Sequence, residues 1–201
     1  MITGIIMASG FSKRMNKNKL TLEIDDTPII ERVIRAVKGS YVEDILVIYR
    51  QREIRKIAEK NNVKAIYNVY ASQGQSEAIK LGIRAADPQS KGYMFFVGDQ
   101  PFLKANTINQ LIEAFNKAPQ TITLPLYNGK RGNPVIFPID FKDALLGITG
   151  DQGGRGIIEQ EKKVNCITIE DSRIGIDIDT WQQYEKLYGG DEINEKKYSG
   201  D

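Results

Sequence analysis

The hydrophobic positions of the chain fall into short apolar runs separated by longer amphipathic stretches. The runs have the length and composition of strands that are buried on both faces of a sheet. Over the first two-thirds of the chain, strands are predicted for residues 2–7, 44–49, 64–67, 93–97 and 121–124.

Between these runs, apolar residues recur at the spacing of one helix face. Ile30, Val33, Ile34 and Val37 follow this spacing in a helix that is predicted to begin at Thr27-Pro28, with Pro at its first position. Further helices are predicted for residues 51–61, for the stretch that follows 74–76, and around 108–115. The alternation of strands and helices predicts a single α/β domain with a doubly wound, mostly parallel sheet.

The last third of the chain has a different pattern. Asn128-Gly129 is a strong turn signal, so the strand predicted for 131–137 returns as a small antiparallel extension of the sheet. A glycine-rich loop is predicted for 150–156, strands for 164–169 and 175–178, and a last helix that Asp179 caps. Residues 189–201 are polar and lack periodicity, so we expect one domain over 1–188 and a flexible tail after it.

Composition and charge narrow the functional classes. With 201 residues, 41% of them hydrophobic and 27% charged, the chain is long enough for one full core. The net charge of +2 does not suggest a nucleic-acid binder. The chain has no histidine, which excludes histidine bases and histidine metal ligands, so a metal would be held by oxygen as Mg²⁺ or Mn²⁺.

Two further absences in the sequence bear on location and redox chemistry. No apolar stretch reaches about 18 residues and no leader pattern opens the chain, so we expect a cytoplasmic protein without a membrane partner. Cys166 is the only cysteine, which excludes a disulfide framework within one chain. We expect it to be a small core residue of the strand at 164–169.

The first strand leads into a loop with the properties of a phosphate-binding site. Small residues at Ala8, Ser9 and Gly10 let a backbone approach a ligand closely, and cations follow within the next residues. These cations are Lys13, Arg14, Lys17 and Lys19. Neither G-x-x-x-x-G-K-[ST] nor G-x-G-x-x-G is present, and a solvated basic loop is the alternative interpretation.

The order A-x-G-x-S-x-R-M-x-x-x-K in this loop resembles the signature of the molybdopterin nucleotidyltransferases, which usually read L-A-(A/G)-G-x-S-x-R-M-G-x-x-K. Met7 stands for Leu, Ser9 for Ala or Gly, and Asn16 for Gly. The resemblance implies a Rossmann-like fold in which Ala8, Ser9 and Gly10, with Arg14 and Lys19, hold a nucleoside triphosphate.

Two acidic segments resemble the metal site of the same family. Asp99 follows an apolar strand in G-D-Q-P, which resembles the metal-binding G-D-(M/Q)-P, although a plain turn also favours Asp. Asp177 lies in D-I-D-T near the C-terminus, which resembles the family's D-i-D-T-p-e-D, with Trp181-Gln182-Gln183 in place of Pro-Glu-Asp. The resemblance implies that Asp99, and Asp177 as a second ligand, hold Mg²⁺.

Three more segments complete the resemblance. Residues 68–76 resemble the loop that meets the base and ribose, with Asn68, Gly74 and Ser76 as candidates, although capping of a helix would equally explain Ser76. On the acceptor side, R-G-N-P-V resembles R-G-(H/N)-P-v, and G-D-Q-G-G-R resembles G-D-x-G-x-R. Their candidates for binding the acceptor are Arg131, Asn133 and Arg155. Such glycine-rich turns also occur for geometric reasons alone.

The resemblance implies a cytidylyltransferase that transfers CMP from CTP to the terminal phosphate of molybdopterin and releases pyrophosphate. The resemblance implies that Arg14, Lys19 and Asp99 are catalytic. It also implies a transient contact of the protein with a molybdoenzyme or its maturation factor. CTP is favoured because the positions of Ala8-Ser9 are commonly Ala-Ala in cytidylyl enzymes and Gly-Gly in guanylyl enzymes. The alternatives are use of GTP, another phosphorylated acceptor such as a sugar phosphate or a small alcohol phosphate, and a non-catalytic nucleotide-binding regulator.

Overall fold

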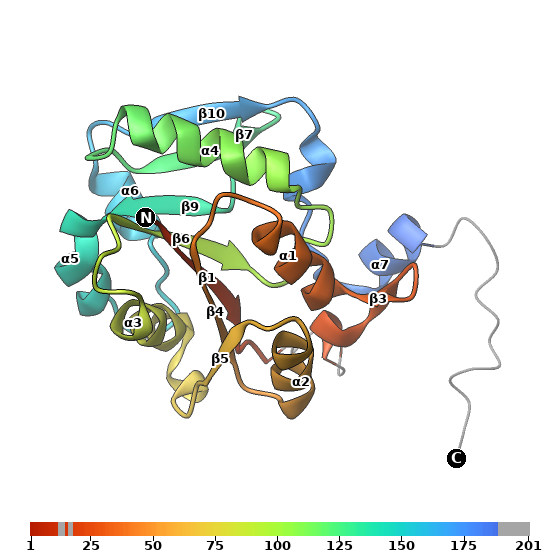
Figure 1. Cartoon of the computed structure of the whole chain (residues 1–201). Coiled ribbons are helices and arrows are strands. Elements are labelled where there is room, and N and C mark those ends of the chain that lie inside the picture. Colours follow the sequence, from red (N-terminus) through yellow and green to blue (C-terminus); the bar gives the residue numbers. More distant parts are fainter. Residues whose placement is uncertain (12–14, 16–17, 189–201) are drawn as a thin grey trace, which may run out of the picture.

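One large sheet forms the centre of the molecule in a computed structural model that describes residues 1–11, 15 and 18–188 (Figure 1). Within these residues its strand order is β10-β7-β9-β6-β1-β4-β5, and β8 pairs with β7. The strands are β1 (Thr3–Ala8), β4 (Asp44–Tyr49), β5 (Lys64–Tyr67), β6 (Gly92–Val97), β7 (Thr123–Tyr127), β8 (Lys130–Arg131), β9 (Val135–Pro138) and β10 (Asn165–Ile169). The predicted fold class is confirmed, because parallel pairing dominates and β9 is antiparallel to both of its neighbours.

Helices cover both faces of this sheet (Figure 1). Helices α1, α2 and α4 lie on one face, and α3, α5 and α6 lie on the other. The helices are α1 (Ile29–Lys38), α2 (Arg52–Lys60), α3 (Gln75–Ala85), α4 (Ala105–Lys117), α5 (Lys142–Gly147), α6 (Arg155–Gln160) and α7 (Trp181–Tyr188). None of the described helices is long and apolar enough to cross a membrane.

The strand order reverses at β1, which creates a switch point in the sheet. From β1 the chain adds β4 and β5 on one side through α1 and α2, and then α3 carries it back so that β6 pairs on the other side. The loops that leave β1 and β6 therefore diverge at the same edge, where open α/β sheets bind ligands.

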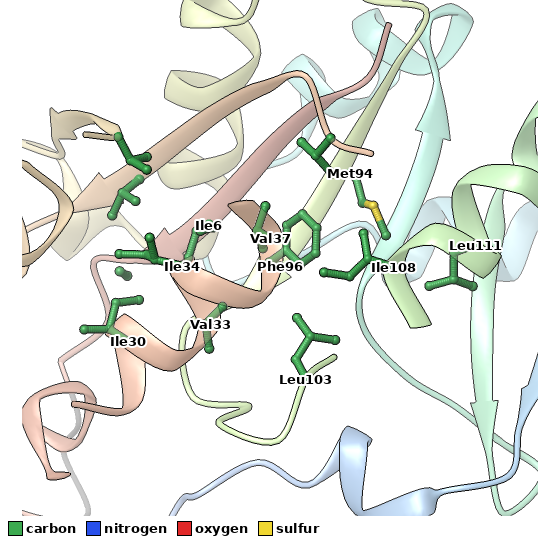
Figure 2. Packing of buried hydrophobic residues seen from close by; sticks show 14 of the residues in the cluster. Ile6, Ile30, Val33, Ile34, Val37, Met94, Phe96, Leu103, Ile108 and Leu111 are labelled. Atoms are coloured by element: carbon green, nitrogen blue, oxygen red, sulfur yellow. The ribbon is translucent and has the colours of Figure 1, made fainter. Parts of the chain in front are cut away.

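Apolar side chains of β1 and β6 anchor the helices on both faces. Figure 2 shows Phe96 between Val37 of α1 and Ile108 of α4, and Ile6 beside Ile34 of α1. Phe96 is 1% exposed, and burying such a side chain contributes about 1.5–3 kcal/mol. On the opposite face Ile5 packs with apolar residues of α3. Because β1 is buried on both faces, packing on the two faces fixes the position of its carboxyl end.

Three segments in the last third of the chain differ from the predictions. The strand predicted for 175–178 is wrong, since Ser172–Gly175 forms a 3-10 turn and the amide of Ile178 donates to the carbonyl of Asp99 instead of joining a ladder. The strand predicted for 131–137 is divided into β8 and β9 by a cis Asn133-Pro134 bond. The loop predicted for 150–156 ends at Gly154, and α6 begins at Arg155.

Two predicted side-chain placements are also wrong. Cys166 is exposed, because β10 lies at the edge of the sheet and alternation turns this residue outward while Ile169 is buried. Asp179 does not cap α7; Thr180 does, since its hydroxyl accepts from the amide of Gln183, whose side chain accepts in return from the amide of Thr180.

The segment before α1 differs from the prediction by one element. Thr27–Pro28 forms β3, which pairs with β2 (Glu23–Ile24) in a small antiparallel sheet, and α1 begins at Ile29 with Pro28 at its N-cap. The tail predicted for 189–201 lies outside the described residues.

We expect Glu31→Gln to lower the melting temperature at pH 7. The free energy of unfolding should fall by roughly 1–3 kcal/mol, the usual loss when a buried charged hydrogen-bond partner is removed. Glu31 is buried in α1 and accepts from Arg35, 2.7 Å away, with Lys60 of α2 at 3.5 Å. Burial alone would raise the pKa of Glu31, but hydrogen bonds from Arg35 and Asn61 and the nearby cations lower it below the usual 4.5.

The pH dependence checks the cause of this loss. A lowered folded-state pKa means that the stabilisation is present above the unfolded value and is lost as the pH falls through the folded value. The difference in melting temperature between wild type and variant should therefore shrink between pH 7 and pH 3. Glu59→Gln, which breaks an exposed pair with Arg55, is the matched control and should change little. A pH-independent difference would contradict the electrostatic cause.

Candidate functional site

A cavity of about 620 Å³ opens at the carboxyl ends of β1 and β6, at the switch point of the sheet. Its walls come from the loop after β1, the turn after β6, the loop before α3, and two segments of the last third of the chain. The lining residues that carry polar groups or close backbone approaches include Ser9, Gly10, Lys19, Gly74, Gln75, Asp99, Asp151 and Asp179.

Lys19 joins two carboxylates that are far apart in the sequence. Its Nζ lies 2.6 Å from Oδ2 of Asp99 and 2.7 Å from Oδ1 of Asp179. Lys19 and Asp99 are mostly buried, with side chains 15% and 17% exposed. Two of the predicted site residues, one for the triphosphate and one for the metal, are thus brought into direct contact.

The charges around Lys19 keep it protonated. Burial by itself would lower the pKa of Lys19, but the negative charges of Asp99 and Asp179 and the hydrogen bonds to both carboxylates outweigh it and raise the pKa. Lys19 therefore carries a full positive charge at neutral pH, which suits contact with phosphate oxygens.

Asp177 lies beside this ion pair. The backbone bond from Ile178 to Asp99 holds the segment next to β6, and the side chain of Gln100 hydrogen-bonds to Asp177. Loss of solvent around the carboxyl group, and then the negative charge of Asp99, raise the pKa of Asp177 to about 6, although part of the side chain remains open to solvent. The carboxylates of Asp99 and Asp177 lie near each other, and this concentration of negative charge favours a bound cation.

The residues present fit a hard divalent cation. Oδ1 of Asp99 is buried and has no hydrogen-bond partner among the described residues, so it has a free lone pair in a position where water is excluded. Carboxylate oxygens are the ligands that Mg²⁺ and Mn²⁺ prefer. The described residues contain no ready cluster of three or more metal-ligating side chains, so protein ligands would come from Asp99 and Asp177 with other oxygens from substrate or water.

Ser9 and Asn68 form a second, uncharged part of the site. Asn68 is 1% exposed, and its Nδ2 donates to Oγ of Ser9 at 3.0 Å, while its Oδ1 accepts from the amide of Tyr70 at 3.1 Å. The backbone amide of Asn68 donates to the carbonyl of Tyr49 at the end of β4. Asn68 does not itself line the cavity; it holds Ser9, which does.

Gly74 and Ser76 connect the cavity to the glycine-rich loop. Gly74 has φ +111°, and an added Cβ would collide with the backbone of Gly150, so only glycine fits there. The amide of Ser76 donates to the carbonyl of Gly150 at 3.1 Å. Ser76 does not cap α3, because the N-cap position is Gly74, and its buried hydroxyl has no partner among the described residues.

The predicted acceptor residues lie farther from the ion pair. Arg131 is exposed in β8, and the carbonyl of Asn133 accepts from the hydroxyl of Tyr127 at 2.9 Å. Arg155 begins α6, pairs with Glu159 at 2.8 Å, and lines a second cavity of about 610 Å³. Asp151 lies in the wall of both cavities, which makes the 150–154 loop the boundary between them.

The structure leaves one predicted residue without a position and adds two that the sequence did not single out for this site. Arg14 lies outside the described residues. Asp151 lines both cavities, and its place in G-D-Q-G-G-R was the available signal. The sequence predicts Asp179 as a helix cap, whereas in the structure Asp179 lines the cavity. The available signal was its alternation with Asp177, which places both carboxylates on one side of an extended segment.

The fold and the cavity together define a class, the open α/β sheets with a ligand-sized cavity at the switch point. The particular family follows from the sequence: residues 4–164 match the MobA-like NTP transferase domain, and the chain belongs to that family.

Curated relatives agree with this family at low identity. The chain is 24% identical to the purine catabolism protein PucB of Bacillus subtilis (strain 168), with 92% of this chain and 95% of PucB covered. It is 25% identical to the probable molybdenum cofactor guanylyltransferase of Pyrococcus furiosus, over 62% of this chain and 61% of the relative. It also matches the bifunctional protein GlmU of Thermoanaerobacter pseudethanolicus at 25% identity, but spans only 33% of its length.

Solved structures share the fold. Rv0371c from Mycobacterium tuberculosis H37Rv superposes with a TM-score of 0.81 at 20% identity, covering 94% of this chain and 97% of that one. A complex of Rv0371c with manganese gives 0.78 at 19% identity, with 94% and 99% covered. A CMP:2-keto-3-deoxy-manno-octonic acid synthetase complexed with CTP gives 0.76 at 13% identity, with 94% and 97% covered.

We expect Asp99→Asn to reduce turnover on the order of 100-fold or more, by analogy with the loss of one electrostatic stabiliser. The amide keeps the size of the side chain but removes the charge that would hold a cation. The fold should persist, because Lys19 keeps Asp179 as its partner. Steady-state rates with Mg²⁺ and a melting curve measure both effects. Asp140→Asn, an exposed carboxylate, is the control; near-normal activity of Asp99→Asn would refute the metal role.

Lys19→Ala should lower kcat/KM for the nucleotide by about 2–4 kcal/mol of transition-state stabilisation, because a cation beside the leaving pyrophosphate offsets its developing charge. The variant should also lose stability, since Asp99 and Asp179 would face each other without a counter-charge. Lys142→Ala removes an exposed lysine of α5 and serves as the control. An unchanged kcat/KM would contradict a role of Lys19 in catalysis and leave it a structural role only.

Proposed function

We propose that the protein transfers CMP from CTP to the terminal phosphate of molybdopterin, releasing pyrophosphate. The observation that carries this proposal is the composition of the cavity at the switch point. A charged part formed by Lys19, Asp99 and Asp179 suits a triphosphate with its metal, and an uncharged part around Ser9 suits a base. Membership of the MobA-like family supports nucleotidyl transfer as the reaction.

The proposed reaction needs no histidine base. An anionic oxygen of the acceptor phosphate attacks the α-phosphorus of the nucleotide, and the bond from that phosphorus to the bridging oxygen breaks. Pyrophosphate leaves with the electron pair, and one new phosphoanhydride bond is formed. The contribution of the protein is positioning and charge neutralisation, in which Lys19 would face the phosphates. Arg14, which we propose for the same role, lies outside the described residues.

Mg²⁺ is the proposed cofactor, with Mn²⁺ as a substitute. Asp99 and Asp177 would hold it, and it would neutralise charge on the phosphates when bound. The manganese complex of Rv0371c, which shares the fold, supports a divalent cation in this family. The buried, unpartnered Oδ1 of Asp99 supports the position of the site in this chain.

The choice of CTP rests on the end of β1. Ala8 and Ser9 both carry side chains and are 4% and 7% exposed; Ala8 packs in the core, and Ser9 lines the cavity, where its side chain occupies space that a glycine would leave open to a larger base. Several structural neighbours are cytidylyl enzymes by name, among them the synthetase complexed with CTP and a 4-diphosphocytidyl-2C-methyl-D-erythritol synthase. Their acceptors differ, so another phosphorylated acceptor remains the alternative substrate class.

Guanylyl transfer to the same acceptor is the second candidate. It is favoured by the name of the Pyrococcus furiosus relative, a probable molybdenum cofactor guanylyltransferase. A non-catalytic nucleotide-binding regulator is disfavoured, because Lys19 and Asp99 are retained together. A cytoplasmic location, and a transient contact with a molybdoenzyme or its maturation factor, belong to the same proposal.

The decisive experiment measures pyrophosphate release with molybdopterin and either CTP or GTP. We expect the wild type to prefer CTP by about 10- to 100-fold, the usual limit for discrimination by shape. The double variant Ala8→Gly/Ser9→Gly should narrow this preference. Equal or better use of GTP by the wild type would overturn the cytidylyl assignment while leaving nucleotidyl transfer in place, and no release with either nucleotide would point to a different acceptor.

A further inference from the structure

The hydrogen bonds of Asn68 determine which way its side-chain amide is turned. A backbone N–H can only donate, so the amide of Tyr70, 3.1 Å away, requires Oδ1 on its side. The NH₂ group must then face Ser9, whose Oγ lies 3.0 Å from Nδ2. Asn68 is 1% exposed, and its backbone amide donates to the carbonyl of Tyr49. These surroundings hold the side-chain amide in this orientation.

The orientation of Asn68 in turn sets the polarity of the Ser9 hydroxyl. Oγ of Ser9 accepts from Asn68, so the hydroxyl proton is not used in this bond. In the part of the chain that the structure describes, no second group accepts that proton, and Ser9 lines the cavity. Ser9 therefore offers the cavity a hydrogen-bond donor.

The sheet order indicates what faces this donor. Asp99 follows β6, on one side of β1, whereas Asn68 follows β5, two strands away on the other side. The metal and phosphates belong with Asp99 and Lys19, so the base belongs on the side of Ser9 and Asn68. Met7, Ala71 and Ala78 line the same cavity as Ser9 and give it apolar wall, which suits the face of a planar base, and the side chain of Gln75 lies against Met7.

We propose that Asn68 is a positioning residue for base selection: it fixes the Ser9 hydroxyl as a donor, which selects a base edge that presents an acceptor. Cytosine presents two acceptors, N3 and O2, on its pairing edge, whereas guanine presents N–H donors at N1 and N2 beside its O6. The inference deepens the proposed function and rests on it for one point, that the cavity holds a nucleotide.

Asn68→Asp tests the polarity directly. The carboxylate keeps the shape of the side chain and still accepts from Tyr70, but its second oxygen takes the Ser9 proton, so Ser9 turns lone pairs to the base. We expect the ratio of CTP to GTP affinity to fall about three- to tenfold, the value of one hydrogen bond. Ser9→Ala should lower the ratio by a similar factor, because it removes the donor.

The double variant Asn68→Asp/Ser9→Ala separates this role from a general effect of charge. Since Asn68 acts only through Ser9 in the proposal, the double variant should show the same ratio as Ser9→Ala alone. Gln73→Glu adds a negative charge to an exposed residue of the same loop and should leave the ratio unchanged. Affinities are measured by titration calorimetry with CTP and GTP in the absence of acceptor, which keeps acceptor identity out of the readout.

The outcomes distinguish this inference from the proposed function. If the wild type bound neither nucleotide, the proposed function would fail. If it preferred CTP but Asn68→Asp kept the wild-type ratio, or lowered it equally in the Ser9→Ala background, the role of Asn68 would be refuted and the bond would be structural only. Should Asn68→Asp not fold, Asn68→Ala replaces it: the freed hydroxyl should give a ratio between those of the wild type and Ser9→Ala, and a wild-type ratio would refute the role.

Discussion

The site depends on the parallel pairing of β1 between β4 and β6. In-register pairing aligns Ala8 with Tyr49 on one side and Met7 with Val97 on the other, so three loops leave the sheet at one level. Two of these loops contribute different chemistry: the loop after β1 supplies small residues and Lys19, and the loop after β6 supplies a carboxylate. Close packing of β1 on both faces keeps these loops in register, because sliding the strand by one residue would place side chains of the wrong size in both cores.

The ion pair of Lys19 with Asp99 and Asp179 brings the C-terminal segment to this edge. Asp99 follows a central strand, whereas Asp179 lies in irregular chain just before α7. The shared ammonium group and the backbone bond from Ile178 to Asp99 both draw that segment onto β6. The same interactions that complete the fold thus gather the charged side chains that the proposed function assigns to a triphosphate and its metal.

The sequence predicts the local elements well and the long-range contacts poorly. The strands at Asp44–Tyr49 and Lys64–Tyr67 match the prediction residue by residue, because each is bounded by polar or turn-forming residues. The strand predicted for 175–178 failed because alternation of Ile and Asp satisfies a period of two without a partner strand. Contacts such as Asn68 with Ser9 depend on the paths of two loops, which no local pattern encodes.

The contact of Gly74 with Gly150 has a consequence for how the family can diversify. The two loops touch through backbone atoms, with no side chain between them to absorb a change in either path. A longer or bulkier 150–154 loop from a relative would displace the loop before α3, and with it the wall of the cavity. Chimeras of this chain should therefore exchange both loops as one unit.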